Sequence, residues 1–146
     1  KSIDELFSKE IFENSIMKKT NISETIVTIN EGNGVFTVKK LPSRVQLSCT
    51  CGIICTDVNN DGNLDLIMAG NNFEFKPQFS RLDANYGSVL LGDGKFGFTW
   101  QDYQTSGFTI RNEVKHLKTI KDNNGNIYVI AAINNEAPKL FAITND

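Results

Sequence analysis

Residues 57–67 combine oxygen-bearing side chains with an apolar run, and they read Asp57-Val58-Asn59-Asn60-Asp61-Gly62-Asn63-Leu64-Asp65-Leu66-Ile67. Counted from Asp57, side-chain oxygens fall at positions 1, 3, 5 and 9, and position 7 can offer its backbone carbonyl. Position 6 is Gly62, and glycine adopts the positive φ of a sharp turn without steric cost. The run therefore predicts a tight turn lined with oxygen atoms.

This spacing is typical of a calcium loop, because Ca²⁺ takes about six to eight hard oxygen ligands. The expected ligands are the side chains of Asp57, Asn59, Asp61 and Asp65 and the backbone carbonyl of Asn63. The alternative is an Asx-rich turn without metal. The loop is not an EF-hand, which needs a Glu at position 12 and two flanking helices. Met68 stands at that position, and the flanks 49–56 and 64–69 look like strands.

Two patterns recur at nearly one period. A strand–turn–strand pattern around Gly34 returns 60 residues later around Gly94, and the Asn-Asp-Gly-Asn run around Gly62 returns 63 residues later around Gly125. A fixed period with two hairpins per unit indicates sheets in a repeat architecture such as a β-propeller. We expect an all-β fold of antiparallel β-propeller blades. Because a propeller needs about four to eight blades, two units predict a fragment of a larger one.

The second copy of the loop is degenerate. When the two copies are aligned on their glycines, Ile120 and Tyr128 stand in place of the outer aspartates, and only Asp122 and Asn124 remain as ligand-type residues. We expect this copy to be a plain turn without metal.

The N-terminus differs from the rest of the chain. Ser2 and Glu5 form a capping-box pattern, and apolar residues follow at helical spacing, so residues 2–17 predict a short helix. The expected organisation is a helical lead-in over 1–20, a first repeat over 21–85, a degenerate second repeat over 86–138, and the first strand of a further unit over 139–146.

The composition fits one globular domain: 146 residues, 40% hydrophobic, with a net charge of −2. A nucleic-acid binder needs a basic face and an anionic-membrane binder needs basic clusters, so both are disfavoured. No apolar run approaches the ~20 residues of a transmembrane helix, and the N-terminus has no signal-peptide pattern. Because the chain also lacks an initiator Met, we expect it to be a piece of a longer protein.

Residues 57–71 and the strand–Gly-x-Gly–Phe unit at 87–98 resemble FG-GAP/VCBS-type repeats, which also occur in the integrin α-subunit propeller. The strings at 4–8, 81–84 and 90–94 are similar to bacterial ASPIC/UnbV-type repeat proteins. The resemblance covers almost the whole chain. It implies four-stranded propeller blades, a Ca²⁺ ion held by the loop residues named above, and a secreted or cell-surface, outer-membrane-associated bacterial protein.

The expected function is that of a calcium-binding module for binding or assembly, without enzyme activity. Its expected partners are the remainder of the propeller or other protein subunits. One alternative is a carbohydrate-active enzyme, which would need two carboxylates about 5–9.5 Å apart across a groove. The acids outside the calcium loop are scattered along the sequence. The other alternative is a subunit of an outer-membrane complex that docks through residues 71–86.

Other reactive residues have simpler interpretations. Cys49, Cys51 and Cys55 form a C-x-C-x₃-C pattern that is expected to pack as small apolar side chains, with one disulfide or a metal site as alternatives. Close positions on one regular strand are poor disulfide partners. The single histidine, His116, has no neighbouring nucleophile motif and is expected to be a surface or strand residue. Arg81 and Asp83 are expected to form an ion pair.

Overall fold

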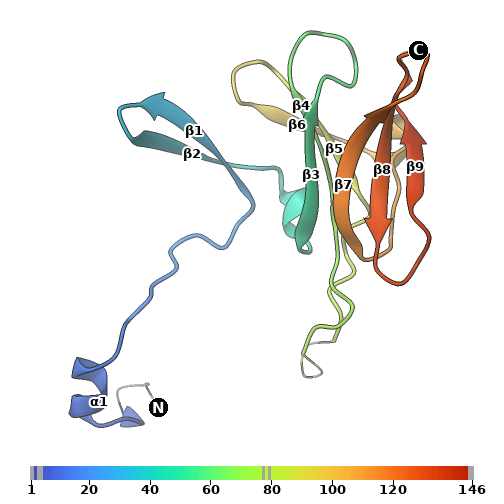
Figure 1. Ribbon diagram of the computed structural model, residues 1–146. Coiled ribbons are helices and arrows are strands. Elements are labelled where there is room, and N and C mark those ends of the chain that lie inside the picture. The colour runs from blue at the N-terminus through green and yellow to red at the C-terminus, as the bar shows by residue number, and fades with distance from the viewer. Residues whose placement is uncertain (1, 3–4, 77, 79, 145–146) are drawn as a thin grey trace.

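The computed structural model describes residues 2, 5–76, 78 and 80–144, and in this part of the chain the strands form three antiparallel sheets (Figure 1). The strands are β1 (Ile26–Gly32), β2 (Val35–Lys40), β3 (Thr50–Thr56), β4 (Asp65–Gly70), β5 (Ser88–Gly92), β6 (Phe98–Gln101), β7 (Val114–Lys121), β8 (Ile127–Ile133) and β9 (Lys139–Ala142). The helical elements are α1 (Lys9–Glu13), the 3₁₀ turn η2 (Ser43–Gln46) and α2 (Tyr103–Ser106). The expected all-β antiparallel class is confirmed.

The central sheet is a meander ordered β3-β4-β5-β6. Its strand β4 is buried along its whole length, as an unbroken apolar run predicts for a strand covered on both faces. A second sheet is ordered β7-β8-β9, and β1 and β2 form a separate hairpin. The predicted hairpins at 25–38 and 87–100 are therefore present. The central sheet takes strands from both sides of residue 85, and the division into two sequence repeats stays a prediction.

The two larger sheets pack against each other through one apolar cluster. Ile54 and Ile67 contribute from the central sheet, and Leu117 and Val129 contribute from the second sheet. At Gly52 the two sheets come close together, because a Cβ atom there would lie 2.8 Å from the Leu117 backbone nitrogen. Any larger residue at this position would push β3 and β7 apart, so Gly52 fixes how closely the sheets pack.

The opposite face of the central sheet has its own cluster. Leu66, Met68 and Leu90 are buried there under Leu41 and Val45, which precede β3. Val27 of the β1–β2 hairpin and Phe98 and Trp100 of β6 are half-buried against the same cluster. The hairpin therefore packs toward the β6 side of this face.

The predicted helix over 2–17 is wrong in extent. Helix α1 spans only five residues, and its N-cap is Ser8, whose side chain makes no capping hydrogen bond. Residues 3 and 4 lie outside the described part of the chain, as do 145 and 146 of the predicted last unit. Leu6, Phe7 and Ile11 are at least half exposed, and α1 lies away from the sheets after an extended segment (Figure 1). Without an apolar surface to pack on, the rest of the predicted segment gains too little from helix formation to offset the cost of ordering it.

Neither helix in the described residues is long and apolar enough to cross a membrane.

Candidate functional site

The oxygen-rich run 57–65 forms the connection between β3 and β4, and Asp65 is the first residue of β4. Both flanks are strands, as expected, so the loop lies in a β-hairpin context and not between helices. Gly62 has a φ of 86°, the positive value that its place in the turn predicts.

Asp65 anchors the loop from inside the protein. Its side chain is fully buried, one carboxylate oxygen accepts the Val58 N–H at 2.8 Å, and the other accepts the Gly92 N–H at 2.8 Å. These two bonds fasten the start of the loop and the end of β5 to the first residue of β4. Among the described residues, none of the ion pairs includes Asp65.

Only one of the two carboxylate oxygens of Asp57 accepts a hydrogen bond from the described residues. Its Oδ2 accepts the Gly62 N–H at 2.9 Å, which closes the turn. Its Oδ1 is buried and has no hydrogen-bond partner among the described residues. A carboxylate oxygen that is removed from water without a donor is costly, so this atom is available for a ligand.

The middle of the loop is a chain of side-chain-to-backbone bonds. Asn59 Oδ1 accepts the Asp61 N–H at 3.2 Å, and Asp61 Oδ1 accepts the Asn63 N–H at 2.8 Å. The Asn63 N–H, followed by the Asn59 amide, holds the pKa of the Asp61 carboxyl below its ordinary value. The Asn63 side chain lies beside Gly94, where a Cβ would be 2.4 Å from its Oδ1. The loop is thus preformed and abuts the β5–β6 turn.

Across the described residues, no three His, Cys, Asp or Glu side chains stand together as a metal site. The three loop carboxylates are held by separate backbone N–H groups and not by one another. Two of the five expected ligands belong to asparagines, Asn59 and Asn63, and a cluster defined by His, Cys, Asp and Glu does not count them. Calcium at this loop stays a prediction.

The two other aspartate turns use their acids differently. At the β7–β8 turn, Asp122 Oδ1 accepts the N–H groups of Asn124 and Asn126 at 2.8 and 2.9 Å, and its Oδ2 accepts from the Asn126 amide at 2.8 Å. At the β5–β6 turn, Asp93 Oδ1 accepts two backbone N–H groups. Both Asp122 oxygens are therefore occupied within their own turn, in contrast to Asp57.

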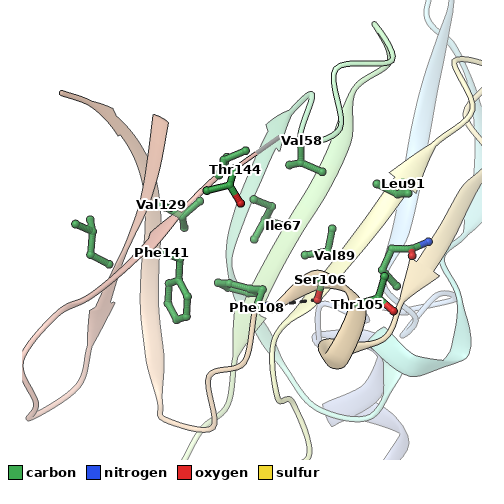
Figure 2. Close-up of a pocket in the computed structure, with 15 residues that line it drawn as sticks. Val58, Ile67, Val89, Leu91, Thr105, Ser106, Phe108, Val129, Phe141 and Thr144 are labelled. Atoms are coloured by element: carbon green, nitrogen blue, oxygen red, sulfur yellow. Dashed lines mark hydrogen bonds between the residues drawn. The ribbon is translucent and has the colours of Figure 1, made fainter. Parts of the chain in front are cut away.

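A pocket of about 550 Å³ lies between the two larger sheets. In Figure 2, Ile67 and Val89 lie on one side of it, and Val129 and Phe141 lie on the other. Phe108 lies between them, and its ring meets that of Phe141 edge-on with the centroids 4.8 Å apart. Hydroxyl groups come from Thr105 and Ser106 of α2 and from Thr144, which follows β9. Sequence analysis missed this pocket, because it is built from residues that each belong to an ordinary strand pattern.

The remaining reactive residues are partly as expected. His116 is exposed on β7, and Arg81 and Asp83 form an exposed ion pair at 2.9 Å. All three cysteines carry free thiols. Cys51 and Cys55 are exposed, so the expectation that they pack as small apolar side chains is wrong for both, and Cys49 is half-buried. They alternate along β3 with Gly52 and Ile54, which are buried, and so share a face with Ile53, which is itself 54% exposed.

The chain therefore offers two candidate sites, the loop 57–65 and the pocket between the sheets. No protein-family model, no curated protein and no solved structure matches the chain. Its function has to be inferred from its own residues.

Proposed function

We propose that this chain is a calcium-stabilised segment of a β-propeller and serves as a binding or assembly module of an exported bacterial protein. In this proposal the loop 57–65 holds a structural cation and catalyses no reaction. The partners are the remainder of the propeller or other protein subunits at the cell surface.

The strand order supports the propeller. A four-stranded antiparallel meander is the form of one propeller blade. The chain leaves the central sheet at β6, passes through α2 and enters the next sheet at β7, which lies beside β3, the first strand of the central sheet. The path from β2 through η2 to β3 has the same form. The β1–β2 hairpin then corresponds to the outer strands of a preceding blade, and β7–β9 to three strands of a following one.

Calcium is supported above all by the buried, donor-free Oδ1 of Asp57. Asp65, whose carboxylate is fully buried, lies at the other end of the same loop. Buried carboxylates are ordinarily paired with a cation, because an uncompensated buried charge costs several kcal/mol. A bound Ca²⁺ would supply this missing positive charge.

The ion would be held by the side chains of Asp57, Asn59, Asp61 and Asp65 and by the Asn63 backbone carbonyl. Bound there, it would fasten the β3–β4 connection. At a concentration about tenfold above its Kd, it would add about 1.4 kcal/mol to the free energy of unfolding.

The test is thermal unfolding of the full chain with excess CaCl₂ and with chelator, combined with calorimetric titration. We expect calcium to raise the melting temperature of the wild type and to bind at one site. Asp57→Asn keeps an oxygen for the Gly62 N–H but lacks the full carboxylate charge, so the calcium-dependent rise should be lost. Asp122→Asn, in the degenerate copy of the turn, should keep it.

An unchanged melting temperature in calcium, or an equal rise in Asp57→Asn and the wild type, would count against the metal. The propeller is tested separately by a structure of a longer form of the protein. That structure should show further four-stranded sheets arranged around one axis, and an open stack of sheets would contradict it.

A further inference from the structure

The two larger sheets meet along one edge and leave a space between them farther away. At Gly52, β3 and β7 lie so close that no Cβ atom fits between them. The described residues that line the pocket of about 550 Å³ belong instead to β4, β5, β6, β8 and β9 or to connecting segments. The sheets therefore pack tightly at β3 and β7 and separate toward their opposite edges.

The described residues that line this pocket include no Asp, Glu, Lys, Arg or His. Ile67, Val89 and Val129 are buried apolar side chains, and Figure 2 shows Val129 and Phe141 across from Val89. An ion that entered would lose its hydration without gaining an opposite charge. The volume lies within the range of about 300–1,000 Å³ for small-molecule pockets. An uncharged small molecule is therefore the occupant that fits.

An aromatic pair forms part of the apolar wall. The rings of Phe108 and Phe141 meet edge-on, and Phe141 is only half-buried. A further aromatic ring packs favourably against such a pair, because the edge of one ring is attracted to the face of another. The wall thus favours a ligand whose apolar part is a ring.

The polar lining groups gather at one end of the pocket, in β6 and α2. Gln101 lies opposite Val89 in the pairing of β5 with β6, so their side chains share the sheet face toward the pocket. The Thr105 hydroxyl donates to Asp102 Oδ2 at 3.0 Å and can still accept a bond. Ser106 Oγ accepts the Phe108 N–H at 3.4 Å and can still donate one. This end therefore offers both donors and acceptors, all of them neutral.

We propose that the pocket between the two larger sheets binds an uncharged small molecule that has an aromatic ring and one hydroxyl or amide head. The ring lies among Val89, Val129 and Phe141, and the head bonds to Gln101 and Ser106. The proposal does not depend on calcium or on the propeller, so its failure would leave both untouched.

The test is an NMR titration of the full chain, observed at its methyl groups, with phenethyl alcohol and with phenylacetate. Both probes carry one ring on a short chain, but phenylacetate is an ionised carboxylate at about pH 7. We expect phenethyl alcohol to shift the methyl signals of Ile67, Val89 and Val129 to saturation. Phenylacetate should bind at least about tenfold more weakly, because the pocket offers no partner for its charge.

Gln101→Leu keeps a side chain of similar size but removes the amide, so it should weaken the binding of phenethyl alcohol about three- to tenfold. Thr99→Val is the matched control. Thr99 is exposed on the same strand and is not among the described lining residues, so this variant should bind like the wild type. Urea unfolding checks that both variants are folded.

The absence of saturable binding would overturn the proposal, as would equal affinities for the two probes or an unchanged affinity in Gln101→Leu. Shifts centred on the exposed Ile53 and Leu64 would show adsorption to surface side chains and would also contradict it. If the methyl signals of the pocket move with protein concentration alone, a second copy of the chain fills the space instead.

Discussion

Asn71, at the end of β4, uses one side chain to join three segments of backbone. Its amide donates to the carbonyl of Asn85 at 2.7 Å and to those of Arg111 and Asn112 at 3.3 Å, and its Oδ1 accepts the Asn85 N–H at 2.9 Å. The residue is 1% exposed and has a φ of 85°, which asparagine tolerates better than most residues. The strand end, the long loop and the entry to β7 thus depend on one amide.

We predict that Asn71→Ala lowers the free energy of unfolding by about 3 kcal/mol, because it leaves buried polar groups unpaired and places a Cβ at positive φ. Asn71→Gly removes the same hydrogen bonds without the backbone strain, so its loss should be about 1 kcal/mol smaller. Urea unfolding of both variants measures the two contributions. Equal losses would mean that the backbone strain is absent.

Glu113 is a buried carboxylate with two side-chain partners. Lys115 donates to it at 2.6 Å and Asn134 at 2.9 Å, and these bonds, the Lys115 bond first, hold the pKa of Glu113 below its ordinary value. Because the unfolded state then binds the proton more tightly, this stabilisation is complete above the ordinary pKa of about 4.3. It is lost as the pH falls through the lower pKa of the folded state.

Glu113→Gln should therefore be less stable than the wild type at about pH 6, and the difference should shrink toward about pH 3. Urea midpoints across this range measure it. Four further aspartates whose pKa is also lowered add to the acid sensitivity of both proteins and cancel in the comparison: the exposed Asp61, Asp93 and Asp102 and the half-buried Asp122. A difference that stays constant with pH would show that the charge of Glu113 has no part in it.

At the scale of elements, the sequence predicted strands better than it predicted the helix. Residues 25–29 and 35–38 are β-branched or aromatic runs around a glycine turn, and such local signals suffice for a hairpin. The helical pattern over 2–17 has equally good local signals but no apolar surface to pack on. Strand β3 also carries a bulge at Cys51, because Thr50 pairs with Gly70 and Gly52 pairs with Ala69. No local pattern could predict this bulge, since it arises from the pairing of β3 with β4.

Because α1 makes no contact with either buried cluster, we predict that removing residues 1–22 changes the free energy of unfolding by less than about 0.5 kcal/mol. Urea unfolding of the shortened and full chains tests this. The circular dichroism spectrum should lose only the helical signal of α1. A large destabilisation would mean that the lead-in packs on the sheets in solution.

For the whole molecule, the candidate loop was foreseeable and its surroundings were not. The loop is continuous in sequence, so its turn and its glycine could be placed from the order of residues 57–65. The pocket and the Asn71 contacts join residues far apart in the chain, and no local pattern encodes which strands meet. The exposed face of β3 could not be predicted from the sequence either, because its exposure depends on where the β1–β2 hairpin comes to lie.

That uncovered face leads to a prediction about association. Ile53 in β3, Leu47 before it and Leu64 before β4 are each more than half exposed. Exposed apolar side chains favour protein–protein contact where they lie together in one patch. We predict that the chain self-associates as its concentration rises, and that Ile53→Lys lowers this tendency because the partner would have to desolvate an ammonium group. The urea midpoint should change little, since an exposed strand position tolerates lysine at a cost of less than about 1 kcal/mol.

Sedimentation velocity over a range of concentrations distinguishes this effect from a general effect of charge. Asn124→Lys adds the same charge at an exposed turn position on β7–β8 and should associate like the wild type. If both lysine variants lose association equally, the loss is a general effect of an added surface lysine and is not specific to the β3 face. If the wild type stays monomeric throughout, the exposed apolar side chains around Ile53 are too scattered to hold a second copy. Association lost only in Ile53→Lys would place Ile53 in the contact between two copies of the chain.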